Sequence, residues 1–314
     1  MTRLWVAWLA VAVISGCLLI AGAAAGERHR VPGTHVTIEP PAGFTPAAQF
    51  PGFLRADIGA SVMVTELPGP VAEVREGMTK EGLAARGMVL LESQAVQVDG
   101  REALLLHIRQ EASGLEYLKW FLLAGDEGGT TLVVGTFPGK EAASLSAPVR
   151  QAVLSAAWDR QAKVDPFEGL LFRLEPTPKL KIANRMNNMV IFNEEGSLRP
   201  LGPGEPFYIA GNAVAKTDIP DLPAFSRTRA LQAANIYLLR NAKGRSIRID
   251  GLDAYELLAE ATHRGSGTPI QFYQVIAPTD GIYFILQGFV ETGRAAEFLA
   301  EFRHITETFR RVKP

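Results

Sequence analysis

The chain has 314 residues, of which 47% are hydrophobic and 21% are charged, and its formal net charge is −1 at pH 7. A chain of this length and hydrophobicity can bury two cores, so we do not expect disorder to dominate. The balanced charge lacks the basic excess typical of nucleic-acid binders, and we expect no nucleic-acid partner.

The first 25 residues differ from the rest of the chain. Arg3 precedes an uncharged apolar run that continues to Ala25, which is the layout of a secretory signal peptide. Cleavage after Ala25 would release the protein, lipidation of Cys17 would attach it to a membrane, and residues 4–25 are long enough to remain as a membrane anchor. Each alternative predicts an exported protein, either periplasmic or membrane-anchored facing the periplasm. Because Cys17 is the only cysteine, no intramolecular disulfide can form.

The remaining sequence contains an internal repeat. Two stretches of the first half recur in the same order in the second half, namely 35–44 with 171–180 and 96–103 with 247–254. The repeat predicts two related domains, 34–164 and 170–314, joined by a short linker near residues 165–169. It also separates patterns shared by both copies, which belong to the fold, from patterns that belong to one copy alone.

In the first copy, apolar runs bounded by glycine, proline and Asp-Gly turns predict an antiparallel meander. The predicted strands are 36–39, 60–67, 88–98, 102–110, 115–123 and 131–137. Apolar residues at helical spacing predict one amphipathic helix from Pro70 to about Gly87 and a closing helix over residues 140–158.

The second copy repeats this order, with an insertion at residues 211–220. The predicted strands are 172–174, 189–193, 206–210, 236–240, 246–249, 254–261, 270–277 and 282–290, and the predicted helices are 222–234 and 294–310. Helices that cover antiparallel sheets indicate an α+β protein built of two tandem α/β sandwich domains, each an antiparallel sheet flanked by helices.

Three shared features carry a resemblance to a known family. They are the opening strand with its prolines and Gly-Phe pair at 38–44, the Asp-Gly turns at 99–100 and 250–251, and the amphipathic closing helices. With these features both copies resemble the PsbP-like family, although the second copy has Lys-Leu at 179–180 where the first has Gly-Phe at 43–44. The resemblance implies a tandem duplication of the PsbP-like fold in a bacterial envelope protein, with non-catalytic binding or assembly roles. It transfers no functional residue.

The sequence shows no spacing typical of a catalytic or metal site. None of the five histidines belongs to an H-E-x-x-H, H-x-H or C-x-x-C pattern, and Ser266 lies in a glycine-flanked turn rather than a nucleophile elbow. His107 lies within a strand, where we expect a structural role, with a general base as the alternative. The carboxylates beside the two Asp-Gly turns are explained by turn formation. We therefore predict no catalytic residue, no metal site and no cofactor.

The least ordinary local feature is a run of cations without an intervening acid. These candidate binding residues are Arg227, Arg229, Arg240, Lys243, Arg245 and Arg248. They could contact an anionic partner, lipid headgroups or the more acidic first domain, or remain a solvated surface. The insertion at 211–220 is a second candidate contact surface.

These observations predict a non-enzymatic exported envelope protein that acts as a protein-binding or assembly module. Its partner would be an unknown envelope protein or a lipid surface, with the N-terminus available for membrane association. One alternative is a carrier of a small apolar or lipid-like ligand, held between sheet and helix or between the domains. Strand aromatics such as Tyr117, Trp120 and Tyr273 would then line the ligand site rather than form core. A hydrolase with an unrecognised site would instead show a cluster of perturbed titratable groups in a cleft.

Overall fold

The computed structural model describes residues 27–159, 161–197, 201–214 and 216–312. The predicted signal or anchor segment and Cys17 lie outside these residues. Within the described residues, no helix has the length and apolar character that a bilayer crossing requires.

The first half of the chain folds around one seven-stranded antiparallel sheet of order β3-β4-β5-β9-β8-β7-β6, with β1, β2 and β10 forming a small separate sheet. Its strands are β1 (His29–Arg30), β2 (Val36–Ile38), β3 (Thr45–Pro46), β4 (Gly52–Arg55), β5 (Ala60–Pro68), β6 (Met88–Val98), β7 (Arg101–Ala112), β8 (Leu115–Gly125), β9 (Gly129–Pro138) and β10 (Ala157–Trp158). Its helices are α1 (Val71–Glu76), α2 (Lys80–Ala84), η1 (Gly139–Glu141) and α3 (Ala142–Leu154).

The second half forms a second seven-stranded antiparallel sheet of order β12-β13-β14-β18-β17-β16-β15, with β11 and β19 paired separately. Its strands are β11 (Phe172–Arg173), β12 (Lys181–Met186), β13 (Met189–Asn193), β14 (Phe207–Asn212), β15 (Ile236–Ile249), β16 (Leu252–His263), β17 (Pro269–Thr279), β18 (Ile282–Glu291) and β19 (Arg310–Arg311). Its helices are α4 (Leu222–Leu231), η2 (Thr292–Arg294) and α5 (Ala295–Glu307). The predicted fold class, α+β with two tandem sandwich domains, is confirmed.

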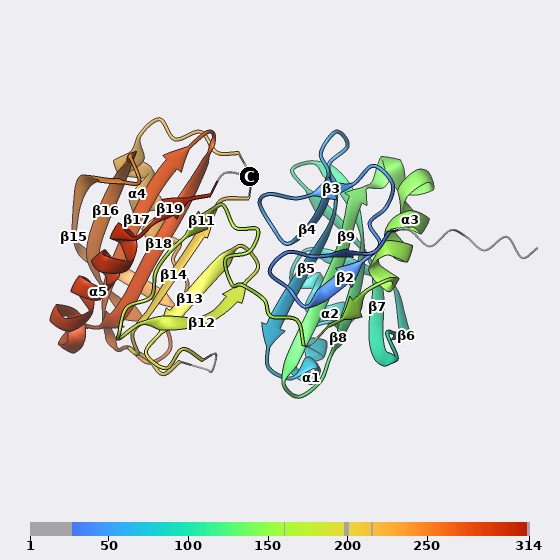
Figure 1. Ribbon diagram of the computed structural model, residues 1–314, viewed down its shortest axis with the longest axis horizontal. Helices are drawn as coiled ribbons and strands as arrows, with labels where there is room; N and C mark the ends of the chain where they lie inside the picture. The colour runs from blue at the N-terminus through green and yellow to red at the C-terminus, as the bar shows by residue number, and fades with distance from the viewer. Residues whose placement is uncertain (1–26, 160, 198–200, 215, 313–314) are drawn as a thin grey trace, which may run out of the picture.

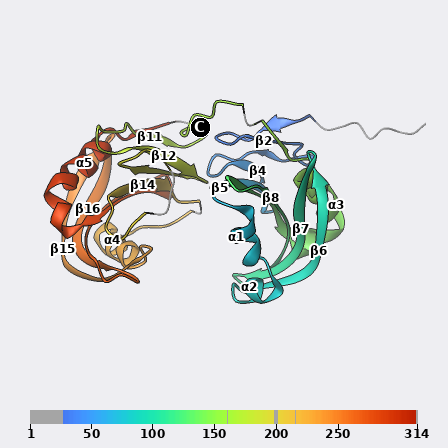
Figure 2. The same cartoon turned by 90° about the horizontal axis from the view of Figure 1, so that it is seen from below.

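The two domains lie side by side (Figure 1), and from below they form the two sides of an arch (Figure 2). The closing helices α3 and α5 cover the outer faces of the sheets, whereas α1 and α4 lie on the inner side. Each sheet therefore buries apolar residues on both faces: one core packs against each closing helix, and separate clusters lie under α2 and α4.

Two glycines define which positions of the domains are equivalent. Gly135 on β9 lies beneath α3, where an added Cβ would collide with Val149, and Gly288 on β18 lies beneath α5, where it would collide with Phe302. Strand registers extend this equivalence. Val62 and Trp120 pair with Gly135, and Tyr208 and Tyr273 pair with Gly288.

The Asp-Gly turns form the predicted hairpins. Asp99 and Asp250 have φ of 50° and 48°, and the glycine that follows each also has positive φ, which a tight two-residue hairpin turn requires. Each aspartate also accepts a hydrogen bond from the segment after the closing helix, at 3.1 Å from the backbone nitrogens of Trp158 and Arg311 respectively. The turn role expected for Asp99 and Asp250 is thus confirmed.

Several predicted elements are wrong in extent. The helix predicted over 70–87 is two short helices, because Gly77 ends α1 and the Thr79 side chain caps α2 by accepting from Gly82 N at 3.1 Å. The first closing helix stops at Leu154, because Ala157–Trp158 pairs with β2 instead.

The second domain differs from expectation at both edges of its sheet. The strands predicted at 236–240 and 246–249 are one continuous strand, β15, with register shifts on either side of Arg240. At the other edge, the unpredicted strand β12 lies beside β5 of the first domain.

Candidate functional site

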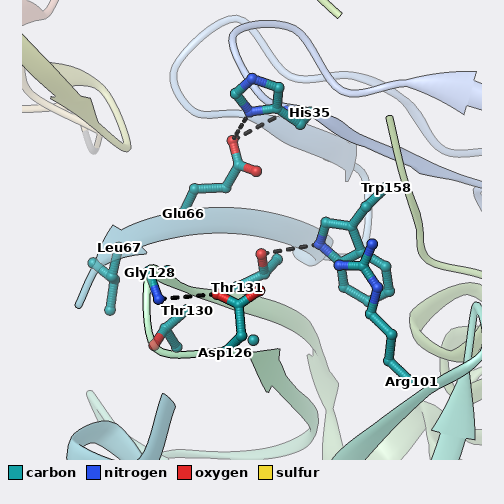
Figure 3. A pocket seen from close by; sticks show the side chains of 11 residues that line it. His35, Glu66, Leu67, Arg101, Asp126, Gly128, Thr130, Thr131 and Trp158 are labelled. Carbon is teal, nitrogen blue, oxygen red and sulfur yellow. Dashed lines mark hydrogen bonds and ion pairs between the residues drawn. The ribbon is translucent and has the colours of Figure 1, made fainter. Parts of the chain in front are cut away.

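A cavity of about 350 Å³, lined by both charged and apolar residues, opens in the first domain, between the small β1-β2-β10 sheet and the turn joining β8 to β9 (Figure 3). Its lining combines one pair of hydrogen-bonded side chains, one stacked pair and a glycine-rich turn. The lining residues are His35, Glu66, Leu67, Arg101, Gly125, Asp126, Gly128, Gly129, Thr130, Thr131 and Trp158.

Trp158 fixes one wall of the first-domain cavity. Its indole Nε1 donates to Thr131 Oγ1 at 3.0 Å, and its backbone nitrogen is held by Asp99. The Arg101 guanidinium lies 5.2 Å from the centroid of the Trp158 ring, a cation–π contact (Figure 3). Within the described residues, Arg101 forms neither a salt bridge nor a side-chain hydrogen bond.

The His35–Glu66 pair fixes another wall. Glu66 Oε2 accepts from the backbone nitrogen of His35 at 3.1 Å and lies 3.2 Å from its Nδ1 (Figure 3). A carboxylate only accepts hydrogen bonds, so Nδ1 carries a proton, and in the neutral form of the ring Nε2 presents a lone pair. The two residues are 31 positions apart in the chain, and no sequence motif connects them.

At the equivalent place in the second domain, a buried phenylalanine occupies the space. The strand registers make Thr131 equivalent to Phe284, which is 2% exposed and packs at 4.9 Å, centroid to centroid, on Phe309. By the same registers Glu66 is equivalent to Asn212, and Arg101 to Leu252. A comparison of the two repeats could have pointed to the first-domain cavity from the sequence. The first copy has threonine and arginine, at Thr131 and Arg101, where the second copy has phenylalanine and leucine.

A second cavity, of about 280 Å³, lies between the two domains on the other side of the His35–Glu66 pair. Arg185 on β12 lines this cavity and is 9% exposed. Its Nε donates to Asn187 O at 2.8 Å and its Nη1 donates to Glu168 O, while the Glu168 carboxylate accepts from Arg30. Burial lowers the pKa of Arg185 to about 10, although the nearby Glu168 charge raises it. We interpret this network as the contact that joins the linker to both domains.

Burial also shifts the pKa of three groups that line neither of these two cavities. Burial raises the pKa of Tyr208 and of Tyr273, and Thr306 Oγ1 lies within hydrogen-bonding distance of both hydroxyls. Burial lowers the pKa of His107, whose ring stacks on Trp120 at 4.1 Å between centroids. Trp120 and Tyr273 are buried, which confirms the core interpretation for these two, whereas Tyr117 is only half-buried.

The structure places the six candidate cations on two elements of the second domain. Four lie on β15, namely Arg240, Lys243, Arg245 and Arg248, and two lie on α4, namely Arg227 and Arg229. Paired residues of neighbouring strands share a face, so the register of Arg245 with Glu256 places Arg245 on the α5 side. Glu256 binds Arg245 at 2.8 Å and Arg303 of α5 at 3.1 Å.

Comparisons with known proteins give no family assignment. No family model and no curated protein matches the chain. Similar solved structures include Mycobacterium tuberculosis LpqN, involved in cell envelope biogenesis (14% identity, 45% of this chain and 83% of that chain, TM-score 0.32), and PsbP of Synechocystis (14%, 45% and 92%, TM-score 0.26). A third is TplEi, an immunity protein of the T6SS of Pseudomonas aeruginosa (11%, 90% and 96%, TM-score 0.34). Membership of the PsbP-like family stays a prediction.

Proposed function

We propose that this chain is a non-enzymatic exported envelope protein that binds an acidic, extended segment of another envelope protein along β15. The observation that carries the proposal is the position of β15, a strand of 14 residues at the free edge of the second sheet. An edge strand has unpaired backbone groups, and an extended segment can add to it as a further strand. In Figure 1, β15 lies at the end of the molecule farthest from the first domain.

The charge of β15 favours an acidic partner. Arg240 and Lys243 are exposed, and within the described residues they form neither ion pairs nor side-chain hydrogen bonds. Arg248 contacts Asp253 at 3.1 Å, but the two side chains are 72% and 87% exposed, so this pair remains accessible. Cations on an edge also oppose pairing with a second basic edge, which disfavours self-association through β15.

Apolar side chains at the start of β15 would add area to such a contact. Tyr237 and Leu238 are 39% and 58% exposed, and Leu231 at the end of α4 is 71% exposed. Leu238 has φ of 54° at the first register shift, so regular pairing resumes only from Lys243 onward. We therefore expect the partner strand to align with residues 243–249.

The non-enzymatic part of the proposal is supported by the sequence, which shows none of the spacings typical of a catalytic or metal site. In the first-domain cavity, Thr130 Oγ1 donates to Gly69 O at 3.0 Å, and Thr131 Oγ1 holds the Trp158 indole by accepting its N–H. Export is supported by the sequence of residues 1–25, with periplasmic release and membrane anchoring as the two outcomes.

The test is cross-linking of the full-length protein in its native envelope, followed by mass spectrometry of stoichiometric partners. The double variant Arg240→Glu/Lys243→Glu should lose a protein that cross-links to residues 243–249 of the wild type. Lys80→Glu/Lys140→Glu makes the same charge change at exposed first-domain positions and should retain it. Retention of the partner by both variants would refute the proposal. Binding only to anionic vesicles, with no protein cross-link, would assign the surface to lipid instead.

A further inference from the structure

Arg101 supplies to the first-domain cavity a positive group that has no ionic partner among the described residues. Its neighbour Glu102 pairs elsewhere, with Arg75 at 3.6 Å. Arg101 follows the Asp99-Gly100 turn, and its guanidinium is held over Trp158. Because the turn, the ring and the guanidinium are linked by hydrogen bonding and stacking, the cation is positioned before any ligand arrives.

The same cavity supplies negative groups on its other sides. Glu66 directs Oε2 to His35, and its second carboxylate oxygen accepts no hydrogen bond from the part of the chain that the structure describes. Asp126, in the glycine-rich turn, accepts from Gly128 N at 3.0 Å. Figure 3 shows Glu66 and Arg101 on different sides of the cavity. A ligand that satisfied both sides would need an anionic group and a cationic or hydrogen-bonding donor.

These charged groups are not required by the fold. The second domain has the same strands and the same hairpin with Leu252, Asn212 and Phe284 in place of Arg101, Glu66 and Thr131. Phe284 fills the equivalent space, where its ring packs on the phenyl rings of Phe172 and Phe309. Charged groups that surround a cavity in one copy, where the other copy packs apolar side chains, are better explained by a ligand than by stability.

We propose that the first-domain cavity binds a small zwitterion, an ammonium carboxylate of about amino-acid size. The carboxylate pairs with the Arg101 guanidinium, and the ammonium donates to the free oxygen of Glu66. The Nε2 lone pair of His35 accepts a further N–H or O–H from the ligand, and the Trp158 indole contacts its apolar part. The volume of about 350 Å³ falls at the lower end of the range for small-molecule sites.

The test is isothermal titration calorimetry of the purified full-length protein with each proteinogenic amino acid, and with acetate and methylammonium as single-charge probes. At least one amino acid should bind saturably at one site, with each single-charge probe weaker by about tenfold or more. In a two-dimensional NMR spectrum, the same titration should shift the Trp158 indole N–H signal.

Substitutions taken from the second domain provide matched variants. Arg101→Leu and Glu66→Asn should each weaken binding by about tenfold or more, because each removes one charge-assisted hydrogen bond. Thr131→Phe should abolish binding by filling the cavity. Arg86→Leu, at an exposed position after α2, is the control and should bind like the wild type. Absence of saturable binding by every amino acid, acetate binding as tight as that of an amino acid, or unchanged affinity in Arg101→Leu and Glu66→Asn would overturn the proposal.

Discussion

The closing helices of the two domains pack on equivalent strands with different chemistry. Beneath α3, Val149 covers Gly135 and the surrounding core is largely aliphatic. Beneath α5, Phe302 covers Gly288 among phenyl and phenol rings. The glycine under the helix is shared, so it belongs to the fold, whereas the side chain that fills the space differs between the copies.

A second difference concerns charge under the closing helix. The second domain places Glu256 between Arg245 and Arg303, and the registers make this glutamate equivalent to the buried Leu105 of the first domain. The same fold therefore accepts a leucine or a paired carboxylate at this position. A side chain that differs between the two copies can therefore stabilise one domain and take part in binding in the other.

The largest expected effect comes from removing the side chain that covers each glycine. Phe302→Ala should destabilise the second domain by about 3–5 kcal/mol, because it leaves a cavity among buried rings. Val149→Ala should cost the first domain about 2 kcal/mol, since less apolar surface is lost. Hydrogen exchange resolved by domain would measure both changes. Equal losses would show that the two interfaces are energetically alike.

The contact between the domains gives the next prediction. Arg185→Met should make the docking of the two domains less favourable by about 3 kcal/mol, because the guanidinium donates to backbone carbonyls in a buried site. We expect a protease to cleave the linker near residues 161–169 faster in this variant, and the cleavage rate measures the weaker contact. Arg173→Met, at an exposed ion pair with Asp165, is the control and should leave the cleavage rate almost unchanged. Equal cleavage of both variants would contradict the role of Arg185.

A smaller change tests the hydrogen-bonded tyrosines of the second core. Thr306→Val introduces the residue found at the equivalent position of α3, Val153, and deprives Tyr208 and Tyr273 of their shared partner. We expect a loss of about 2 kcal/mol from the second domain, measured by urea denaturation. In the Tyr208→Phe/Tyr273→Phe background the same substitution should cost much less. A similar cost in that background would mean that the hydroxyls are not the cause.

The smallest predicted effect is a pH dependence confined to the first domain. Burial lowers the pKa of His107 below its ordinary value of 6.5, so the unfolded chain binds a proton more readily than the folded domain. First-domain stability should therefore fall as the pH drops below 6.5. The equivalent second-domain residue is Leu258, and His107→Leu should remove this contribution from the first domain. Hydrogen exchange above and below pH 6.5 tests it, and an unchanged pH slope in the variant would contradict the assignment.

Local pattern was enough to predict the meander and both hairpins, because Asp-Gly turns and apolar runs encode them directly. It failed where a distant partner decides the structure. Helical spacing covers residues 140–158, yet Ala157–Trp158 extends to pair with β2. It also failed for the helix predicted over 70–87, where Gly77 and the Thr79 cap separate two helices.

The first-domain cavity depends even more strongly on tertiary structure. His35, Glu66, Arg101 and Trp158 come from four separate segments, and sequence spacing gives no reason to group them. The grouping follows only once the register of β5 with β9 and of β2 with β10 is known. The basic run was visible in the sequence, but its division between β15 and α4 follows from the sheet order.

In both domains a strand near the start of the unit pairs with the segment that follows its closing helix, β2 with β10 and β11 with β19. The two ends of each unit therefore meet at one place on its surface. A unit whose ends adjoin can be copied head to tail with a short connection, and it can also be inserted into a surface loop of another protein. The same geometry makes each unit suitable for circular permutation, with new termini at an exposed hairpin such as Ser113-Gly114.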